Sequence, residues 1–531
     1  MSNTPLPARD LTHDLLLPSL LFAALGAMTW AVRGCSGFGA VAGCTFAGLM
    51  WGVAWWFIAR EPGAVQPRRY SSGWIVFALT AGIGIAGSRG WAQWSTLFIG
   101  KLQVHTKDGI WVPIEPWYGF AWMFIAGAAW GGLGACALAW CAHGQPVRWW
   151  TWVLRIASGA GMGWLCVYLF NHFPQYFMPL YSEMGAEYDR ATRDVNNNLF
   201  RLTNDNRAAM QHMGWYLGFL LFEVLRRDWK NVTLITTVGL ISGGGWAALQ
   251  NWMWADTRWP GAFNWWRCWE SSGGIAIGVA YGVAYYLVNR PRSAGELAVP
   301  SARLAHGRIN GEWLTVWLFF ALFPVALTAI ILSNRDLQLL GPLAPLGFYL
   351  FSTANFYSIP ILLIASIAGI LYYLHRRGDA PEEPLADAPP EDHNLERWIV
   401  LSTVFLTLAV NLRNGLKGWA NIYIGNEDLW SARLWYVCGP LMVIMLLYFT
   451  WQLLSRPLPR NHAGDPVPGA YKLVWLMLIL QNIFAQLVTG PHGEGQFAQS
   501  AFSVYYLALF ALTATIFHHY HRRKQAMDKQ V

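Results

Sequence analysis

Four arginines stand at the ends of long apolar runs or inside them, a location costly enough to indicate a function. They are Arg33, Arg89, Arg267 and Arg413. Hydrocarbon solvates charge poorly, so ionisable side chains in such places usually face a cavity and a partner. Brought together, the four guanidinium groups would form a cationic vestibule that could hold a carboxylate, phosphate or sulfate. Taken singly, each arginine could instead extend its side chain to lipid head groups.

Glu270 is the carboxylate that could do proton chemistry beside these arginines. It follows Arg267 by three residues, which puts both side chains on one face of a helix. Three roles fit this position: a structural ion pair, a coupling-proton site, or a general acid or base. His172, at the end of another apolar run, is the alternative base.

Amide and aromatic side chains occupy the same ends of the apolar runs. Tryptophan is abundant, with 33 in the chain, and it is densest in NWMWADTRWPGAFNWWRCWE, residues 251–270. An interfacial belt accounts for many of these residues. Flat aromatic faces beside amides would also suit a sugar ring or a lipid-linked glycan. The predicted substrate-binding residues are Arg33, Arg89, Trp91, Gln250, Asn251, Trp252, Trp265, Trp266, Arg267, Trp269, Asn411, Arg413, Gln481 and Asn482.

Several kinds of chemistry find no support in the sequence. It has no Walker A motif for ATP, no HExxH or Cys/His cluster for zinc, and no GxSxG elbow. The 7 cysteines lie mostly within apolar runs and form no CxxC pair, as expected of small buried thiols. We therefore expect no cofactor and no metal site. The formal charge of +8 is explained by basic loops against anionic lipids, without nucleic acid.

The composition places these residues on membrane helices. Of 531 residues, 55% are hydrophobic and 12% charged, whereas soluble domains have about 25% charged residues. Runs of about 20 apolar residues can each cross the hydrocarbon core as a helix. The predicted fold class is all-α, a polytopic transmembrane helical bundle of about 14 spans. The spans are expected near residues 14–33, 37–59, 73–97, 117–142, 149–173, 211–226, 231–254, 268–289, 313–333, 344–374, 397–413, 430–454, 471–490 and 498–519.

The distribution of Lys and Arg predicts the topology. These residues collect in alternate loops and in both tails, so both termini are expected in the cytoplasm. The polar start runs directly into the first span without a cleavage site, which predicts an uncleaved signal anchor. The expected location is the cytoplasmic (inner) membrane, with the four arginines at the outer face.

Glycine usage divides the chain. Residues 1–290 hold eight expected spans rich in Gly and Trp, whose small residues allow close helix packing. Residues 291–312 are expected to form a cytoplasmic linker. Residues 313–531 should form a six-span bundle, with an acidic, Pro-rich loop at 378–394. The polar stretch 174–210 is either an amphipathic helix, on the spacing of apolar residues from 184 to 202, or a plain connector.

The sequence is compatible with two main classes of function and with a third, less favoured one. The first is a secondary transporter or flippase for an anionic, glycan-bearing or lipid-linked substrate, bound in an outward-facing vestibule of Arg and Trp. The second is a membrane-embedded glycosyl or acyl transferase at the outer face. The third is an assembly or scaffold subunit. A transporter needs polar groups toward both sides, whereas the pocket of an enzyme can be sealed beneath. The expected partners are membrane lipids and a small-molecule, glycan or lipid-linked substrate.

Overall fold

The structure is a computed structural model of the whole chain. The residues it describes are 10–35, 40–60, 69–87, 97, 99–104, 111–141, 149–191, 198–249, 251–289, 400, 403–404, 407–408, 411, 444, 465, 467–489 and 496–528. The expected spans at 313–333 and 344–374, the linker at 291–312 and the acidic loop at 378–394 lie outside the described residues.

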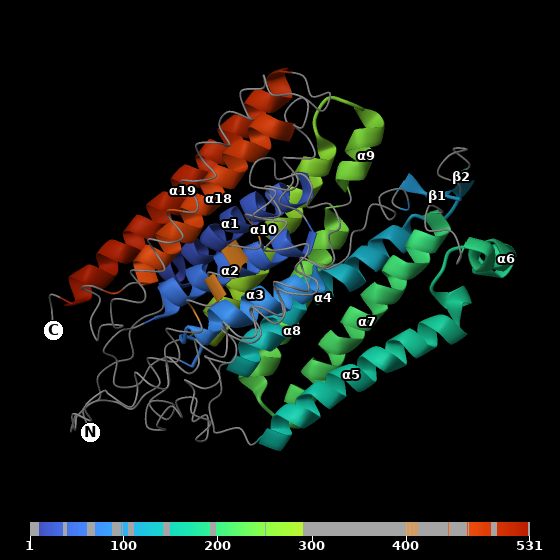
Figure 1. Cartoon of the computed structure of the whole chain (residues 1–531), viewed down its shortest axis with the longest axis horizontal. Helices are drawn as coiled ribbons and strands as arrows, with labels where there is room; N and C mark the ends of the chain where they lie inside the picture. The colour runs from blue at the N-terminus through green and yellow to red at the C-terminus, as the bar shows by residue number, and fades with distance from the viewer. Residues whose placement is uncertain are drawn as a thin grey trace, which may run out of the picture. The chain divides into compact units, whose positions relative to one another are not determined.

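Helices account for almost all of this part of the chain (Figure 1). A π-helical segment, Thr12–Leu16, leads into α1. The α-helices are α1 (Leu17–Cys35), α2 (Ala40–Ala59), α3 (Trp74–Ala86), α4 (Trp117–Cys141), α5 (Trp149–His172), α6 (Tyr181–Ala191), α7 (Asn198–Leu225), α8 (Trp229–Ala248), α9 (Asn251–Arg258), α10 (Trp265–Val288), α18 (Val467–Thr489) and α19 (Gln496–Asp528). One antiparallel hairpin, β1 (Lys101–Gln103) with β2 (Trp111–Pro113), precedes α4.

Seven helical segments among the described residues are long and apolar enough to cross a bilayer. They are Thr12–Gly34, Ala42–Ala59, Trp117–Cys141, Trp150–His172, Trp229–Arg258, Trp265–Val288 and Phe497–Ala526. The shorter apolar helices Trp74–Ala86 and Val467–Ile483 lie among them. The chain is therefore a helical membrane protein, while the total of fourteen spans stays a prediction.

The chain divides into two compact units, residues 1–304 with 460–531, and residues 305–459. The last two helices thus belong to the same unit as the Gly-rich helices. Arg60, after α2, forms an ion pair with Asp465 at a distance of 3.2 Å, and the Lys524 ammonium of α19 donates to the Arg60 carbonyl at 2.9 Å. The boundaries expected at 290 and 312 stay a prediction, because the chain between α10 and residue 400 is not described.

Small residues let helices of the first unit touch through their backbones. A Cβ added to Gly26 of α1 would lie 2.1 Å from the Gly274 carbonyl oxygen of α10, far inside van der Waals contact. Gly82 of α3 and Gly134 of α4 approach each other in the same way. The close packing expected of the Gly-rich runs is confirmed at these contacts.

The indole rings of several tryptophans fill the space between these helices. Trp30, Trp51, Trp130, Trp246 and Trp269 come from five helices, and each is at most 2% exposed. The Trp130 and Trp246 rings are 4.6 Å apart, and the Trp246 and Trp269 rings are 5.0 Å apart. We call these five residues the tryptophan core. They lie inside the bundle, so an interfacial belt does not account for them.

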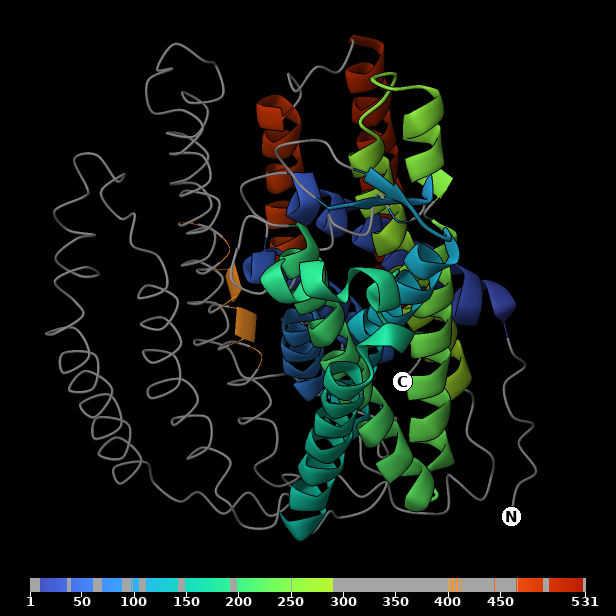
Figure 2. The same cartoon turned by 90° about the vertical axis from the view of Figure 1, so that its right-hand side faces the viewer.

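The hairpin and the short helices α6 and α9 lie at one end of the first unit, and the C-terminal end of α19 lies at the other (Figure 1). Figure 2 looks onto the former end and places β1, β2 and α6 in front of the longer helices. The amphipathic helix considered for 184–202 is helical in its described parts, in α6 up to Ala191 and in α7 from Asn198, and its continuity through 192–197 stays a prediction because those residues are not described. The span expected at 211–226 is the second half of the 28-residue helix α7.

Replacing Gly274 by Ala should lower the thermal midpoint of the purified protein, because the new methyl group would meet α1 where an added Cβ lies 2.0 Å from the Gly26 carbonyl oxygen. Overpacking of this kind costs about 1–3 kcal/mol. Gly244→Ala is the matched control, since a Cβ at Gly244 meets nothing within 4 Å. Thermal unfolding in detergent measures both variants. Equal midpoints for the two would contradict the close contact between α1 and α10.

Candidate functional site

Arg33 and Glu270 form a buried ion pair between the last turn of α1 and the first turns of α10. Arg33 Nη1 lies 3.1 Å from Glu270 Oε1 and 3.2 Å from Oε2. The side chains are 9% and 1% exposed. Asn264 sets the start of α10 by accepting a hydrogen bond from the Arg267 amide at 2.9 Å. The geometry thus places one carboxylate and one guanidinium group within two apolar segments.

Neighbouring groups fix the position of this pair. The Arg33 guanidinium lies over the Trp30 ring, 5.6 Å from its centroid. A Cβ at Gly34 would lie 2.2 Å from the Glu270 carboxyl carbon, so glycine leaves the space that the carboxylate occupies. The Trp266 indole donates to the Gly34 carbonyl at 3.3 Å. The buried Arg33 Nε has no acceptor among the described residues.

Arg267 makes a different contact from the one that its spacing to Glu270 indicated. Its Nη1 donates to the Gln486 Oε1 of α18 at 2.7 Å, and its guanidinium lies 4.9 Å from the Phe502 ring of α19. The Gln486 amide in turn donates to the Gln499 carbonyl at 2.9 Å and to Ser503 at 3.2 Å. Arg267 therefore connects α10 to both C-terminal helices, while Glu270 connects α10 to α1.

Several of the expected aromatic residues also meet near the start of α10. The Trp266 and Trp269 rings are 4.6 Å apart, and Trp252 stacks on Trp265 at 5.8 Å. The Trp252 indole donates to Ser272 at 3.0 Å. Trp265, Trp266 and Trp269 lie on α10, the helix that carries Glu270 and Arg267, and Trp252 reaches them from α9, so the structure brings this part of the expected set together.

Other expected residues have separate surroundings. Gln481 and Asn482 of α18 are buried, whereas Asn251 is exposed and bonds to the Ala248 carbonyl at 2.9 Å. His172 is exposed, and it contacts the carbonyl and the ring of Tyr168 in its own helix. Asn411 belongs to the second unit. Arg89, Trp91, Gln250 and Arg413 lie outside the described residues, so their roles stay predictions.

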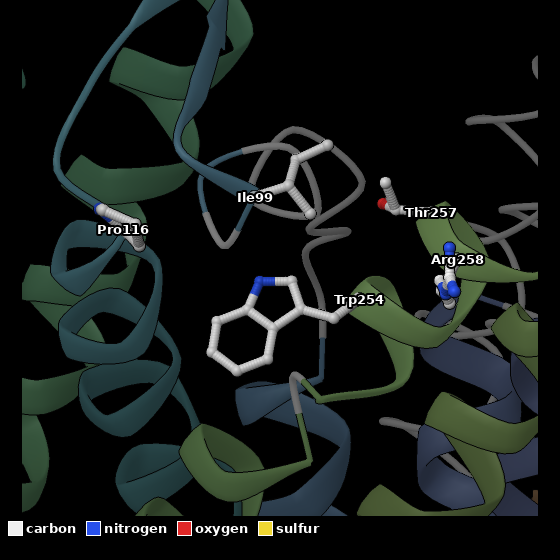
Figure 3. Close-up of a pocket in the computed structure, with 5 residues that line it drawn as sticks. All are labelled: Ile99, Pro116, Trp254, Thr257 and Arg258. Carbon is white, nitrogen blue, oxygen red and sulfur yellow. The ribbon is translucent and has the colours of Figure 1, made fainter.

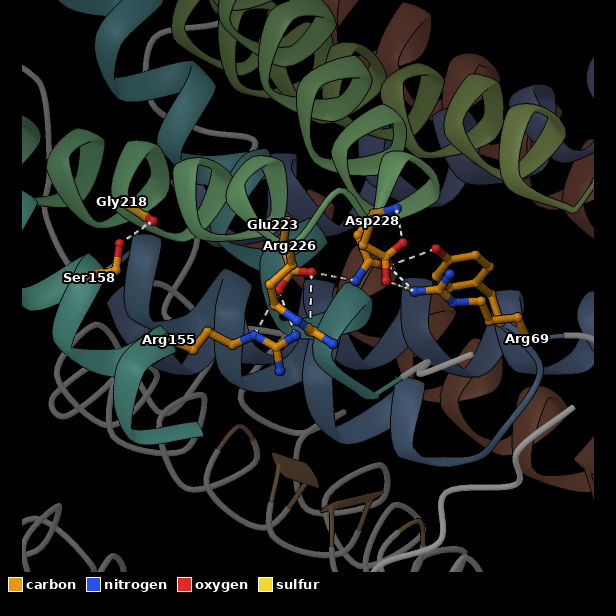
Figure 4. A network of polar contacts seen from close by, with 9 residues as sticks. Arg69, Arg155, Ser158, Gly218, Glu223, Arg226 and Asp228 are labelled. Carbon is orange, nitrogen blue, oxygen red and sulfur yellow. Dashed lines mark hydrogen bonds and ion pairs between the residues drawn. The ribbon is translucent and has the colours of Figure 1, made fainter. Parts of the chain in front are cut away.

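A second buried ion pair, Arg155 with Glu223, joins α5 to α7 (Figure 4). Arg155 Nε donates to Glu223 Oε1 at 2.7 Å, and both side chains are 0% exposed. The guanidinium lies over the Trp140 and Trp152 rings, 5.3 and 5.1 Å from their centroids. Asn231 of α8 donates to the other Glu223 oxygen at 2.9 Å.

The contacts continue from Asn231 to the segment before α3. Its Oδ1 accepts from Arg69 at 2.9 Å and from the Tyr70 hydroxyl at 2.8 Å, and Arg69 also binds the Asp228 carboxylate at 2.6 Å (Figure 4). We call Arg69, Tyr70, Arg155, Glu223, Asp228 and Asn231 the Glu223 network. Burial tends to raise the pKa of Asp228, but the hydrogen bond and charge of Arg69 outweigh it and leave that pKa lowered.

The two ion pairs lie at opposite ends of one bundle. Helix α8 begins beside the Glu223 network at Asn231 and reaches the tryptophan core at Trp246, which contacts Trp269 one residue before Glu270. Fifteen helical residues separate Asn231 from Trp246, a rise of about 22 Å. The predicted site residues include neither Arg155 nor Glu223, so this network was not expected from the sequence. The available signal was their opposite charge within neighbouring apolar runs.

Span-length helices with buried ion pairs define the class of this chain, a polytopic helical membrane protein. No family model matches the chain, and neither a curated protein nor a solved structure matches it. In the described part of the chain, no three His, Cys, Asp or Glu side chains gather where they could hold a metal ion.

Removing one partner of the Arg33–Glu270 pair should destabilise the protein more than removing both. Glu270→Gln leaves a buried guanidinium without its counter-charge, which costs about 3–5 kcal/mol. Arg33→Met with Glu270→Gln removes the charge on both sides and should recover part of that loss. Thermal midpoints are measured for wild type, Arg33→Met, Glu270→Gln and the double variant, and together they give a double-mutant cycle. Strictly additive losses would contradict an energetic coupling between these groups.

Acid should lower the stability of the folded protein, partly through protonation of Asp228. Its folded pKa is lowered, so the pairing with Arg69 stabilises the folded state above the unfolded pKa of about 3.9 and is lost as pH falls through the folded pKa. The stability gap between wild type and Asp228→Asn should therefore shrink from pH 7 to pH 3. Asp256→Asn, at an exposed position, is the control and should follow wild type. A gap that is constant with pH would contradict this role.

Proposed function

We propose that the protein is a secondary transporter or flippase in which the Arg33–Glu270 pair couples proton movement to substrate movement. The observation that carries this proposal is the carboxylate at 1% exposure, bonded to an arginine of another membrane helix. Charges within membrane segments are expensive and mark ion pathways and substrate sites. Apolar residues often replace a buried ion pair with little loss of stability, so stability alone is a weak reason for a charged pair between α1 and α10.

Protonation of Glu270 would remove the negative charge that holds Arg33. The guanidinium would then be available to an anionic group, together with the Arg33 Nε, which already has no acceptor among the described residues. Return of the proton to solution would restore the ion pair and expel the anion. This exchange of one negative partner for another supports coupling between a proton and an anionic substrate.

The surroundings of the pair support the substrate class. Trp266 and Trp269 place two indoles beside the start of α10, and Arg267 adds a second cation on the same helix. Aromatic faces with guanidinium groups suit a sugar acid, a sugar phosphate or a lipid-linked glycan. An anion would compete with Glu270 for Arg33 and with Gln486 for Arg267, because both arginines have protein acceptors.

Polar groups toward both ends of the bundle also favour transport. The Glu223 network joins α5, α7, α8 and the segment before α3 at the end opposite to Glu270. Alternating access requires contacts that close each side in turn, and ion pairs between different helices can open and close with small helix movements. With both termini in the cytoplasm, Glu270 belongs to the outer side and Glu223 to the inner side.

One observation favours the alternative, a glycosyl or acyl transferase at the outer face. The tryptophan core adjoins the ion pair, since Trp30 is one turn from Arg33 and Trp269 is next to Glu270. A site sealed on its inner side suits an enzyme, with Glu270 as the base. In a transporter, α1 and α10 must move to open this layer.

Transport is tested in proteoliposomes that contain pyranine as a pH reporter. Phosphate, sulfate and glucuronate are added outside in turn, and a fluorescent anionic lipid with dithionite quenching tests lipid flipping. We expect wild type to show proton flux or flipping with one of these probes. Glu270→Gln should fall to the level of protein-free vesicles, whereas Glu115→Gln, an exposed carboxylate, should keep the wild-type rate.

The same proteins in detergent micelles separate the two functions. Micelles enclose no compartment, so transport cannot be measured in them. A transferase would still move sugar from a polyprenyl-phosphate sugar to an acceptor in micelles, and mass spectrometry would detect the product. Equal flux in Glu270→Gln and wild type would reject Glu270 as the coupling group.

A further inference from the structure

A depression of about 350 Å³ lies at the same end of the bundle as the hairpin, separate from the Arg33–Glu270 pair. Its lining residues are Ile99, Pro116, Trp254, Thr257 and Arg258 (Figure 3). Ile99 lies just before β1, Pro116 directly precedes α4, and the other three belong to α9. In Figure 3 the Trp254 indole lies between Pro116 on one side and Thr257 and Arg258 on the other.

The lining combines an apolar floor with one cation. Trp254 is 45% exposed, and its ring meets Phe120 of α4 edge-on at 5.8 Å, a contact that holds the indole in place. The Thr257 hydroxyl donates to the Met253 carbonyl at 3.0 Å. Arg258, the last residue of α9, is exposed and carries the only formal charge among the lining residues. This combination fits a ligand with an anionic group beside an apolar one.

The depression lies beside the ends of two segments that are long and apolar enough to cross a bilayer, and lipid head groups are expected at such ends. Arg258 ends the apolar segment Trp229–Arg258, and Pro116 immediately precedes the segment Trp117–Cys141. Exposed tryptophans, which favour the interface between lipid and water, occur on the same elements. They are Trp111 at 42%, Trp117 at 55% and Trp259 at 58% exposure. A phospholipid with its phosphate beside Arg258 would place its glycerol and acyl chains beside the apolar lining residues.

We propose that this depression binds a phospholipid with an anionic head group. The Arg258 guanidinium donates to the lipid phosphate, and the start of an acyl chain packs on Trp254, Ile99 and Pro116. A free phosphate has no apolar part to fill the floor, and a neutral sugar has no charge for the arginine. The site does not involve Glu270, so it stands whether or not the protein is a transporter.

Native mass spectrometry of the whole protein in detergent tests this site, with phosphatidylglycerol and phosphatidylcholine as probes. We expect the tightest binding step of wild type to prefer phosphatidylglycerol. Arg258→Gln should weaken that step about tenfold, because a charge-assisted hydrogen bond is lost. Arg258→Lys should retain part of the affinity, since it keeps the charge but not the planar fork. Arg522→Gln is the control for net charge, because Arg522 is exposed on α19 outside the depression.

A second pair of variants tests the apolar floor. Trp254→Ala should weaken the same binding step, whereas Trp259→Ala, a neighbouring exposed tryptophan that does not line the depression, should leave it unchanged. Thermal midpoints close to wild type show that the variants are folded. Equal affinities for the two lipids, equal effects of Arg258→Gln and Arg522→Gln, or displacement of the lipid by millimolar inorganic phosphate would each overturn the proposal.

Discussion

Backbone contact between α1 and α10 is the constraint on which the rest of the first unit depends. Gly26 and Gly274 meet without side chains between them, and Gly278 meets Phe22 in the same way one turn further along. At this separation the two helices run together for most of their length, and the end of α1 is brought to the start of α10. Arg33 can reach Glu270 because the glycines hold the helices close.

The same glycines explain why the large indoles are internal. A Cβ at Gly273 would lie 2.2 Å from the Trp246 ring, and one at Gly127 would lie 2.6 Å from Trp246. Trp246 thus fills a space that glycines of α4 and α10 leave open, and Trp51 and Trp30 meet Gly26 and Gly274 in the same way, so the interior is closely packed. This layer matters for both candidate functions, because it contacts Arg33 through Trp30 and would have to move if a substrate passed.

The two ion pairs at opposite ends of the bundle differ in how many partners share the carboxylate. Arg33 binds both carboxylate oxygens of Glu270, so a change of charge at Glu270 acts directly on the contact between α1 and α10. Glu223 instead shares its carboxylate with Arg155 and Asn231, and the network spreads the charge over four segments. The first arrangement is suited to switching and the second to holding helices together. A carboxylate with several partners loses less of its interaction energy when one partner leaves.

The sequence by itself determined the class of protein and the course of most helices in the first unit. The expected spans 117–142 and 149–173 coincide with α4 and α5, since apolar length and the residues at helix ends are local properties. It also identified Arg33, Arg267, Glu270 and the tryptophans near them as unusual, because charge in apolar runs is visible without a structure. It did not determine which of these residues are partners.

Only the tertiary structure paired Glu270 with Arg33, 237 positions away, and Arg267 with Gln486, 219 positions away. Spacing along one helix pointed to Arg267 as the partner of Glu270, but helix packing decides which side chains meet across the bundle. The Glu223 network and the internal position of the tryptophans were hidden for the same reason. Contacts between helices depend on their approach and rotation, and these are set by close packing of small residues from distant parts of the chain.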